Sequence, residues 1–513
     1  AGGRSGARSG AAPARTVTPW GTAWMLLAFM LVNFADKTVL GLSASPVMDE
    51  LGLTREEFGT ASSAFFALFS LAALGGSALT RRVRTPVLLL GMALLWSAAQ
   101  LPMVFAAAGF GTLLVTRVLL GAAEGPAAPV ATHHLHGWFA QRDRTLPTSV
   151  LLFGASAGVA VAAPTLGLVI DRWGWRAAFG TVGAAGLAWA LLWLRYGQEG
   201  PYAPRTAHHR NGESGRPQKH APGQGHASAP GHREHPEGPE AERPRPLPYR
   251  RILLSGTWLA AACGAFAAYW TLSAGLTWSA DYFQETSGLS LRHASLLIML
   301  AALSKGLAMV THGLIVQRAV RRAARGGPVS RAPFSHGVNN GSLMLVSAVA
   351  TAVFATTDVL WLKVVLLLGP MALADIILSV ATTAVSRIAP APQRGVALGA
   401  LTGIFALGGF LAPLVMGRVV DAGASVSGGY RDAYLLMAGL LCAAGLIVTC
   451  FLRPARDAAR LGVPEEPPHD GPGTPGTARD AGPGADAGTG TDAHPRPRSG
   501  DAPPAPRPSE RPL

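Results

Sequence analysis

Long apolar stretches alternate with short polar segments along most of this chain. Each stretch has about the 20 residues that a helix needs to cross the hydrocarbon core of a bilayer. Twelve such spans are predicted, at residues 20–42, 59–79, 86–108, 110–135, 147–170, 175–196, 252–278, 291–316, 337–355, 360–387, 395–420 and 430–452. The pattern therefore predicts an all-α polytopic membrane protein.

The polar segments divide these spans into two sets of six. Gly, Pro, His, Arg or Asp replace the aliphatic residues in the tail 1–19, the linker 197–251 and the tail 453–513. Such segments cannot bury a core, so we expect them to be disordered. Two six-helix halves remain, residues 20–196 and 252–452. Repeated halves are typical of transporters, whose binding site lies near the middle of the membrane.

Arginines gather in alternate connections between the spans. They are concentrated after the second, fourth, eighth and tenth spans, at Arg81, Arg82, Arg84, Arg142, Arg144, Arg318, Arg321, Arg322, Arg325, Arg331 and Arg394. Because positive loops stay in the cytoplasm, both termini are predicted there, and the heavy use of Ala, Gly, Pro and Arg indicates a bacterial cytoplasmic membrane. This distribution also accounts for the net charge of +14 without a nucleic-acid partner.

Two charged side chains interrupt the fourth span. Arg117 and Glu124 are seven positions apart, close to two helical turns, so they leave the helix on nearly the same face. An ionisable side chain at this depth costs on the order of 3 kcal/mol and usually faces a bundle interior or a wet cavity. The pair suits an anion site and a proton site, or else an ion pair with a neighbouring helix or a snorkelling arginine. Gly121 and Gly125 allow close helix approach beside Glu124.

Other residues in the spans are candidates for lining a central cavity. Lys305 and Asp375 could line it or satisfy each other. Tyr269 and Trp270 could stack on an organic substrate, although core packing is the favoured interpretation. The histidines of HHLH, residues 133–136, lack a further ligand at a suitable spacing, so no metal site is predicted. No nucleophile, metal trio or nucleotide loop indicates an enzyme.

Four segments resemble the major facilitator superfamily, and within it the anion:cation symporters of the hexuronate, galactonate and sialin type. They are NFADK at 33–37, RVLLGAAEGP at 117–126, IDRWGWRAAF at 170–179 and the stretch 394–417. The resemblance implies the twelve-helix major facilitator fold and movement of a small organic anion with protons by alternating access. The proton gradient then supplies the energy without a cofactor, and we expect a monomer in the lipid bilayer.

The resemblance also implies roles for single residues. Asp36 and Glu124 match the family's protonation sites, and Lys37 and Arg117 match the cations that engage the substrate carboxylate. Asn33, in the matching NFADK segment, is counted with the substrate-binding residues. Tyr269 and Trp270 are counted there only for the stacking described above, and not because of the resemblance. A substrate anion that binds one of these cations changes the proton affinity of the neighbouring acid. This is a mechanism for coupling substrate binding to proton binding.

Departures from the family leave alternatives open. Lys37 stands where the family has arginine, and it lacks the planar fork of that side chain. Thr80 and Gln317 stand where the cytoplasmic loops normally carry a carboxylate, which puts the usual gate network in doubt. FGASAG, at 153–158, is less polar than the family's sugar-binding pattern. A proton-driven exporter of a drug or secondary metabolite, and a sensor or scaffold without transport, therefore remain alternative functions.

Overall fold

The computed structural model describes residues 17–80, 82–140, 143–202, 247–324, 337–390 and 393–463. Their secondary structure is helical, which confirms the all-α prediction. Most of the disorder predicted for residues 1–19, 197–251 and 453–513 lies outside the described residues and stays a prediction. It is wrong at the end of the linker, where Tyr249–Leu253 forms a helix because the Leu247 backbone hydrogen-bonds the Gln393 side chain and Ile252 is buried. The described part belongs to one compact unit, Ala1–Glu465, so the division into two six-helix halves also stays a prediction.

The N-terminal group of helices follows the first six predicted spans, except that the second begins earlier, the third ends earlier, at Val104, and the fourth is broken. It comprises α1 (Pro19–Leu42), α2 (Ala44–Leu51), α3 (Arg55–Leu79), α4 (Thr85–Gln100), η1 (Leu101–Val104), α5 (Phe110–Glu124), α6 (Ala127–His136), α7 (Thr145–Trp173) and α8 (Trp175–Tyr196). The second span begins earlier than predicted, because Thr54 and Glu57 cap each other's backbone N–H groups at 2.9 and 3.1 Å. The fourth span breaks at Gly125 and Pro126, since proline has no N–H to continue the helical bonds.

The C-terminal group departs from prediction in its fourth span. It comprises α9 (Tyr249–Leu253), α10 (Gly256–Ser287), α11 (Leu291–Ala324), α12 (Gly337–Thr356), α13 (Leu360–Leu368), η4 (Pro370–Asp375), α14 (Ile376–Ile388), α15 (Arg394–Ala422), α16 (Val426–Phe451) and α17 (Pro454–Leu461). The predicted helix 360–387 is divided at Gly369 and Pro370 into α13, η4 and α14.

The prediction that the chain is unfolded directly after Arg453 is wrong for α17. The reason is Asp457, whose buried carboxylate accepts hydrogen bonds from Thr257 N at 2.8 Å and Thr257 Oγ1 at 2.7 Å. These bonds satisfy free donors at the start of α10. Burial works against ionisation, but hydrogen bonds from Thr257 and Arg456 outweigh it and lower the pKa of Asp457.

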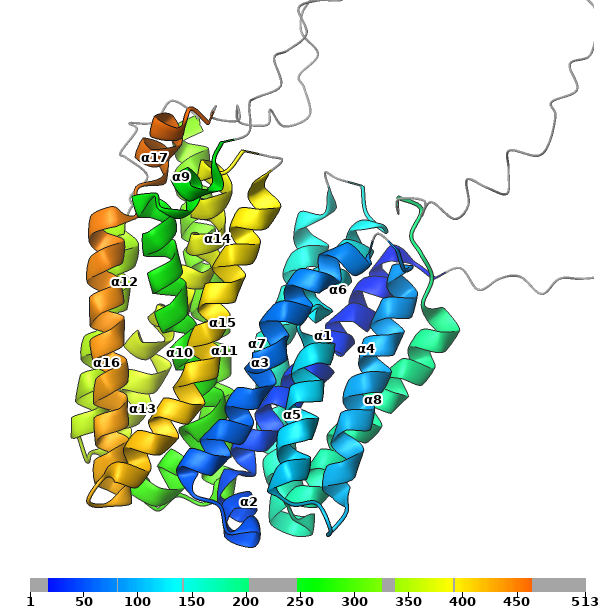
Figure 1. Ribbon diagram of the computed structural model, residues 1–513, viewed down its shortest axis with the longest axis vertical. Helices are drawn as coiled ribbons and strands as arrows, with labels where there is room; N and C mark the ends of the chain where they lie inside the picture. The colour runs from blue at the N-terminus through cyan, green and yellow to red at the C-terminus, as the bar shows by residue number, and fades with distance from the viewer. Residues whose placement is uncertain are drawn as a thin grey trace, which may run out of the picture. The chain divides into compact units, whose positions relative to one another are not determined.

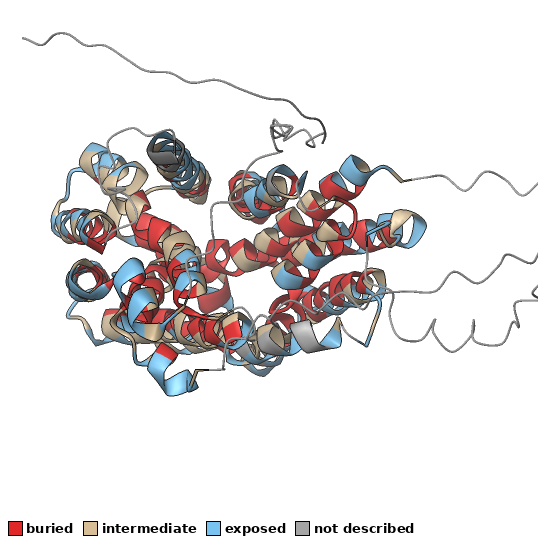
Figure 2. Cartoon of the chain, turned by 90° about the horizontal axis from the view of Figure 1, so that it is seen from above, coloured by how far each residue is buried: buried red, intermediate tan, exposed pale blue. Residues whose placement is uncertain are grey.

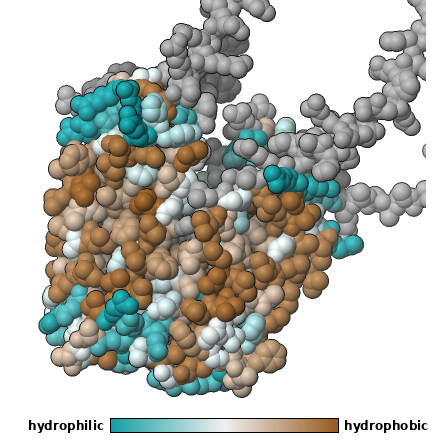
Figure 3. All heavy atoms as spheres, in the orientation of Figure 1, coloured by the Kyte–Doolittle hydropathy of each residue, from teal (hydrophilic) through white to brown (hydrophobic). Residues whose placement is uncertain are grey.

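The chain is a multi-pass membrane protein. Eleven segments within the described residues are long and apolar enough to cross a membrane. The remaining predicted span coincides with α3, part of whose side chains are not described. Figure 3 shows brown apolar surface over the middle of the helices and teal polar surface gathered toward their ends.

Two ends of the bundle can be distinguished by their short helices. The α2 end carries α2, and the opposite end, here the α17 end, carries α6, α9 and α17 (Figure 1). The two groups meet where α3 packs on α15, α1 on α10, and α7 on α11. A Cβ added to Gly59 would overlap the carbonyl oxygen of Pro413, so α3 and α15 touch through their backbones.

Buried residues gather where the helices face one another (Figure 2). One apolar core lies inside each group, and a third contains residues of both, among them Phe58 and Trp278, whose ring centroids are 5.6 Å apart. This shared core fixes α3 against α10 toward the α2 end. It leaves the charged residues Asp36 and Lys37 of α1 and Arg117 and Glu124 of α5 enclosed in the N-terminal group, beside Gln100 of α4.

Candidate functional site

A buried ion pair joins α1 to α5. The Glu124 side chain is 0% exposed and pairs with Lys37, whose Nζ also donates a hydrogen bond to Asn33 Oδ1 at 2.7 Å. Asn33 and Lys37 are one helical turn apart, so both reach the same side of α1. The Lys37 ammonium also lies 4.8 Å from the Phe34 ring and 5.4 Å from the Phe65 ring. The structure thus unites three of the predicted site residues.

A second buried cluster joins α1, α4 and α5 through Gln100. Its Nε2 donates a hydrogen bond to Asp36, and its Oε1 accepts one from Arg117 Nη2 at 3.2 Å. Asp36 and Arg117 are both buried, and the guanidinium stacks 5.2 Å from the Phe179 ring. A neutral amide therefore links an acid and a base that make no direct ion pair. Sequence analysis missed Gln100, although an amide inside an apolar span was a usable signal.

Several polar atoms of these clusters have no hydrogen-bond partner among the described residues. They are Asp36 Oδ2, Glu124 Oε1, Arg117 Nε and Asn33 Nδ2. A buried polar atom without a partner is costly, and an explanation is expected for each one. The two free carboxylate oxygens are positions at which a proton would complete the site.

Lys37 and Arg117 face one small void between the two groups of helices. Its volume is about 30 Å³, and its lining also includes Ser62 of α3 and Thr277 of α10, which hydrogen-bond to each other at 2.9 Å. This space is about one water molecule's share of liquid volume. The two predicted anion-binding cations are therefore brought together, in a void too small for an organic anion.

Both alternatives considered for Lys305 and Asp375 occur together. The two side chains pair at 2.9 Å and line a cavity of about 250 Å³. Thr271 Oγ1 lies 3.4 Å from Asp375 Oδ1. Helices of both groups contribute to the cavity wall, which is mostly apolar.

Tyr269 and Trp270 lie in aromatic packing. Tyr269 is partly buried with its ring centroid 5.9 Å from that of Phe66 and 4.8 Å from that of Phe405. Trp270 is buried in the shared core, and its Nε1 has no hydrogen-bond partner among the described residues. A contact of either residue with substrate stays a prediction.

The histidine cluster is built into the fold. His134 is buried and its Nδ1 lies 2.7 Å from Thr85 Oγ1, while His136 Nε2 lies 3.0 Å from Thr148 Oγ1. No group of three metal-ligating side chains occurs among the described residues.

Gln317 is exposed on α11, and the effect of Thr80 and Gln317 on a gate stays a prediction.

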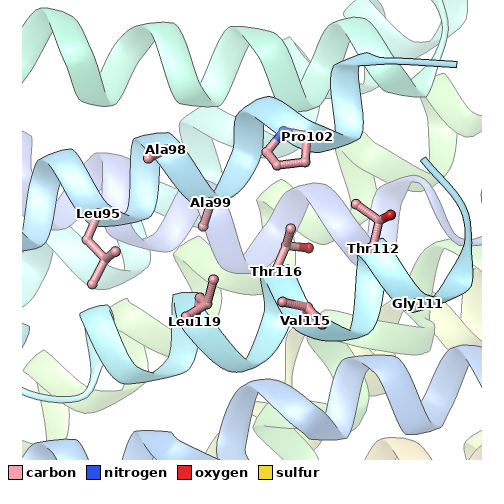
Figure 4. Close-up of a pocket in the computed structure, with 9 residues that line it drawn as sticks. All are labelled: Leu95, Ala98, Ala99, Pro102, Gly111, Thr112, Val115, Thr116 and Leu119. Atoms are coloured by element: carbon pink, nitrogen blue, oxygen red, sulfur yellow. The ribbon is translucent and has the colours of Figure 1, made fainter. Parts of the chain in front are cut away.

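Another cavity lies away from these charged residues. It is a groove of about 490 Å³ between α4 and α5. Figure 4 shows the residues that line it, among them the small or apolar Leu95, Ala99 and Val115. Leu95 and Val115 are exposed, so the groove opens on the outer face of the helices. In a membrane that face meets lipid.

Charged residues hold the two groups together at the α2 end. Arg55 Nε lies 3.0 Å from the fully buried Asp281 of α10, and Arg55 Nη2 lies 3.2 Å from Glu285. Arg418 of α15 pairs with Glu56 at 2.7 Å. We call Arg55, Asp281, Glu285, Glu56 and Arg418 the α2-end latch. This latch could not be predicted from the sequence, because its paired residues lie far apart in the chain.

Comparisons with known proteins agree with this architecture. A family model described as Major Facilitator Superfamily matches residues 25–330. The chain is 26% identical to the hexuronate transporter of Bacillus subtilis (strain 168), over 83% of this chain and 92% of that protein. It is 24% identical to the D-galactonate transporter of Escherichia coli O6:H1, over 77% of this chain and 88% of that protein.

Solved structures with the same fold include a bacterial homolog to the human lysosomal transporter Spinster, with a TM-score of 0.63 at 17% identity, covering 88% of this chain and 99% of that one. A D-xylose-proton symporter has a TM-score of 0.62 at 12% identity, covering 85% and 98%. The family and these relatives are transporters, which confirms that the chain is not an enzyme. Because the family model matches more than half of a chain with this helical fold, the protein belongs to the Major Facilitator Superfamily.

Proposed function

We propose that the protein moves a small organic anion together with protons by alternating access. The observation that carries the proposal is the pair of buried carboxylates, Asp36 and Glu124, each with one unpartnered oxygen, beside two cations that share a void. Its relatives, a hexuronate transporter and a D-galactonate transporter, support a sugar acid or other carboxylate as substrate.

Coupling follows from competition for Lys37. A substrate carboxylate that reaches the void attracts Lys37 and Arg117, and so draws Lys37 away from Glu124. A buried carboxylate that loses its cation is strongly destabilised as an anion, so Glu124 takes up a proton. One negative charge and one proton then cross together, and Asp36 offers a second proton position behind Gln100.

Alternating access requires the void to widen, because about 30 Å³ admits no organic anion. The α2-end latch keeps that end closed while the opposite end opens. We place the α17 end in the cytoplasm, because its connections are rich in basic residues. The described ones are Arg82, Arg84, Arg144, Arg250, Arg251, Arg394 and Arg453. The proton gradient across a bacterial cytoplasmic membrane supplies the energy, without a cofactor and within a monomer.

The test is proton movement into proteoliposomes that contain a pH-sensitive dye. Wild type, Glu124→Gln and Glu199→Gln are challenged with sugar acids, dicarboxylates and aromatic acids. Glu199 is the control, because it pairs with Arg84 at 3.3 Å at the surface, where a salt bridge contributes little. We expect one anion to acidify the lumen in wild type and Glu199→Gln only. Anion uptake without acidification, or with acidification that survives Glu124→Gln, would contradict the proposal.

A second candidate is a proton-driven exporter of apolar compounds. It is favoured by the mostly apolar wall of the 250 Å³ cavity. Cells that express an exporter accumulate less of a lipophilic dye, whereas an anion transporter leaves the dye unchanged. A drop in dye accumulation that Glu124→Gln restores would favour this second function.

A further inference from the structure

We infer that the cavity of about 250 Å³ binds a monocarboxylate with an apolar body, such as an aryl-substituted acid, and that Lys305 receives its carboxylate. This inference rests on the proposed function, whose substrate class it narrows. Leu276 lines both this cavity and the void at Lys37 and Arg117. Lys305 therefore holds the carboxylate while that void is closed, and Lys37 receives it when the void widens. The inferred substrate has an apolar body, whereas a sugar acid carries many hydroxyl groups that the cavity wall would have to hydrogen-bond.

The wall of the cavity is suited to an apolar body. Phe34 and Val159 contribute from the N-terminal group, and Ile298, Met371 and Met437 from the C-terminal group. A sugar acid carries a hydroxyl on nearly every carbon, and each hydroxyl buried here without a partner is costly. Flexible methionines and an aromatic ring instead adapt to an apolar ligand.

Three hydroxyl groups in the wall already donate to backbone carbonyl groups. Ser347 Oγ donates to the carbonyl oxygen of Met371 at 3.2 Å, Thr351 Oγ1 to that of Ser347 at 2.8 Å, and Thr271 Oγ1 to that of Ala268 at 2.7 Å. Each hydroxyl has a single proton to donate. These three hydroxyls are therefore used by the helices that carry them. Ser156, Ser279 and Tyr434 also line the cavity, but their hydroxyls are neutral, so the charge that attracts an anion comes from another residue.

Lys305 is the residue that can receive the anion. Its ammonium has three donors, and the pair with Asp375 at 2.9 Å occupies one of them. The Lys305 side chain is 24% exposed, against 10% for Lys37, so its charge is reachable from the cavity. Asp375 acts as an internal counterion that competes with the substrate carboxylate for Lys305.

The size of the cavity limits the substrate. Its volume equals that of about eight water molecules at roughly 30 Å³ each. Drug-sized ligands occupy larger pockets, from about 300 Å³ upward. A carboxylate on a single ring or a short branched chain fits this space.

Binding to the purified full chain, measured by isothermal titration calorimetry, tests the inference with three probes. These are 3-phenylpropanoate, its alcohol 3-phenylpropan-1-ol, and D-glucuronate. We expect 3-phenylpropanoate to bind at least about tenfold more tightly than the alcohol, because the carboxylate adds a hydrogen bond to a charged group and such a bond contributes at least this factor to the binding constant. Glucuronate should bind most weakly. Equal binding of acid and alcohol, or tighter binding of glucuronate, overturns the inference.

Variants assign the preference to Lys305. Lys305→Met should remove the preference for acid over alcohol, and Asp375→Asn should tighten binding of the acid about fivefold by removing a like charge. The control is Lys363→Met, because Lys363 lies over the Tyr282 ring at 5.1 Å and does not line this cavity. If Lys305→Met does not fold because Asp375 is unpaired, the double variant K305M/D375N keeps the net charge and serves instead. A preference that persists without Lys305 overturns the assignment.

Failure of this inference differs from failure of the proposed function. If glucuronate moves protons in proteoliposomes while 3-phenylpropanoate neither binds nor moves them, the inference falls and the proposed function stands. If 3-phenylpropanoate binds with the expected preferences while no anion moves protons, the inference stands and the proposed function falls.

Discussion

Replacing Lys37 by methionine should destabilise the fold through Glu124. The Glu124 side chain is 0% exposed, its Oε2 pairs with Lys37, and its Oε1 has no hydrogen bond among the described residues. Removing one member of a buried ion pair costs about 3 to 5 kcal/mol, because the other charge is left uncompensated. We expect a loss near 4 kcal/mol for Lys37→Met, since no aqueous exposure of Glu124 relieves it.

Adding Glu124→Gln to Lys37→Met should restore most of the lost stability. In the double variant Lys37→Met/Glu124→Gln no charge is left unpaired, so we expect about 3 kcal/mol to return, while proton movement stays lost. The assay is the free energy of unfolding in mixed micelles, measured for wild type, both single variants and the double variant. A double variant no more stable than Lys37→Met would refute the reasoning, because the cost would then lie in lost packing instead of in the charge.

Three further predictions concern stability. Gln100→Leu should cost about 3 kcal/mol, because it leaves a buried acid and a buried base without their shared amide; chemical denaturation measures it. Gly121→Ala should cost at least about 3 kcal/mol, because the added Cβ would overlap the carbonyl oxygen of Phe65; a loss below about 1 kcal/mol would contradict this prediction. A hydrogen bond from Arg176 lowers the pKa of Glu50. The stabilisation from this hydrogen bond is present at neutral pH and is lost as the pH falls below about 4.5, the ordinary pKa of a glutamate. The free energy of unfolding, measured as a function of pH, should therefore change less over this range in Glu50→Gln than in wild type.

Much of the N-terminal site could be predicted from the sequence, because charge inside an apolar span is rare and informative. Glu124, Lys37 and Asn33 meet as a cluster, and Gly121 brings α5 against α3 as expected. The bridge through Gln100 could not be predicted, since helical spacing says which face a residue occupies but not which neighbouring helix it meets.

Ion pairs between the two groups of helices could not be predicted from the sequence either. Arg55 lies in a connection by pattern, and its partner Asp281 is 226 positions away. The span boundaries erred where polar residues extend a helix beyond its apolar part, as α10 continues to Ser287. Hydropathy records the part of a helix that suits lipid, whereas capping and tertiary contacts decide where the helix ends.

Two Gly-Pro pairs in the sequence mark the interruptions of predicted spans that the apolar pattern did not reveal. One lies at Gly125 and Pro126, directly after Glu124, and the other at Gly369 and Pro370, ahead of Asp375. Each interrupts the fourth span of its predicted half. Interrupted helices at corresponding positions of two repeats point to a transporter's binding site.

The second break is stabilised by neighbouring helices. Ser304 Oγ donates to the carbonyl oxygen of Leu368, and Ser347 Oγ to that of Met371 at 3.2 Å. Irregular backbone is tolerated at membrane depth only where protein or a cavity satisfies its polar groups. A continuous helix would need neither hydroxyl. The break ends at Asp375, which pairs with Lys305 at 2.9 Å, so in each predicted half an acid lies within a few residues of a Gly-Pro interruption of its span. If the proposed alternating access occurs, we expect the two spans to bend at these interruptions.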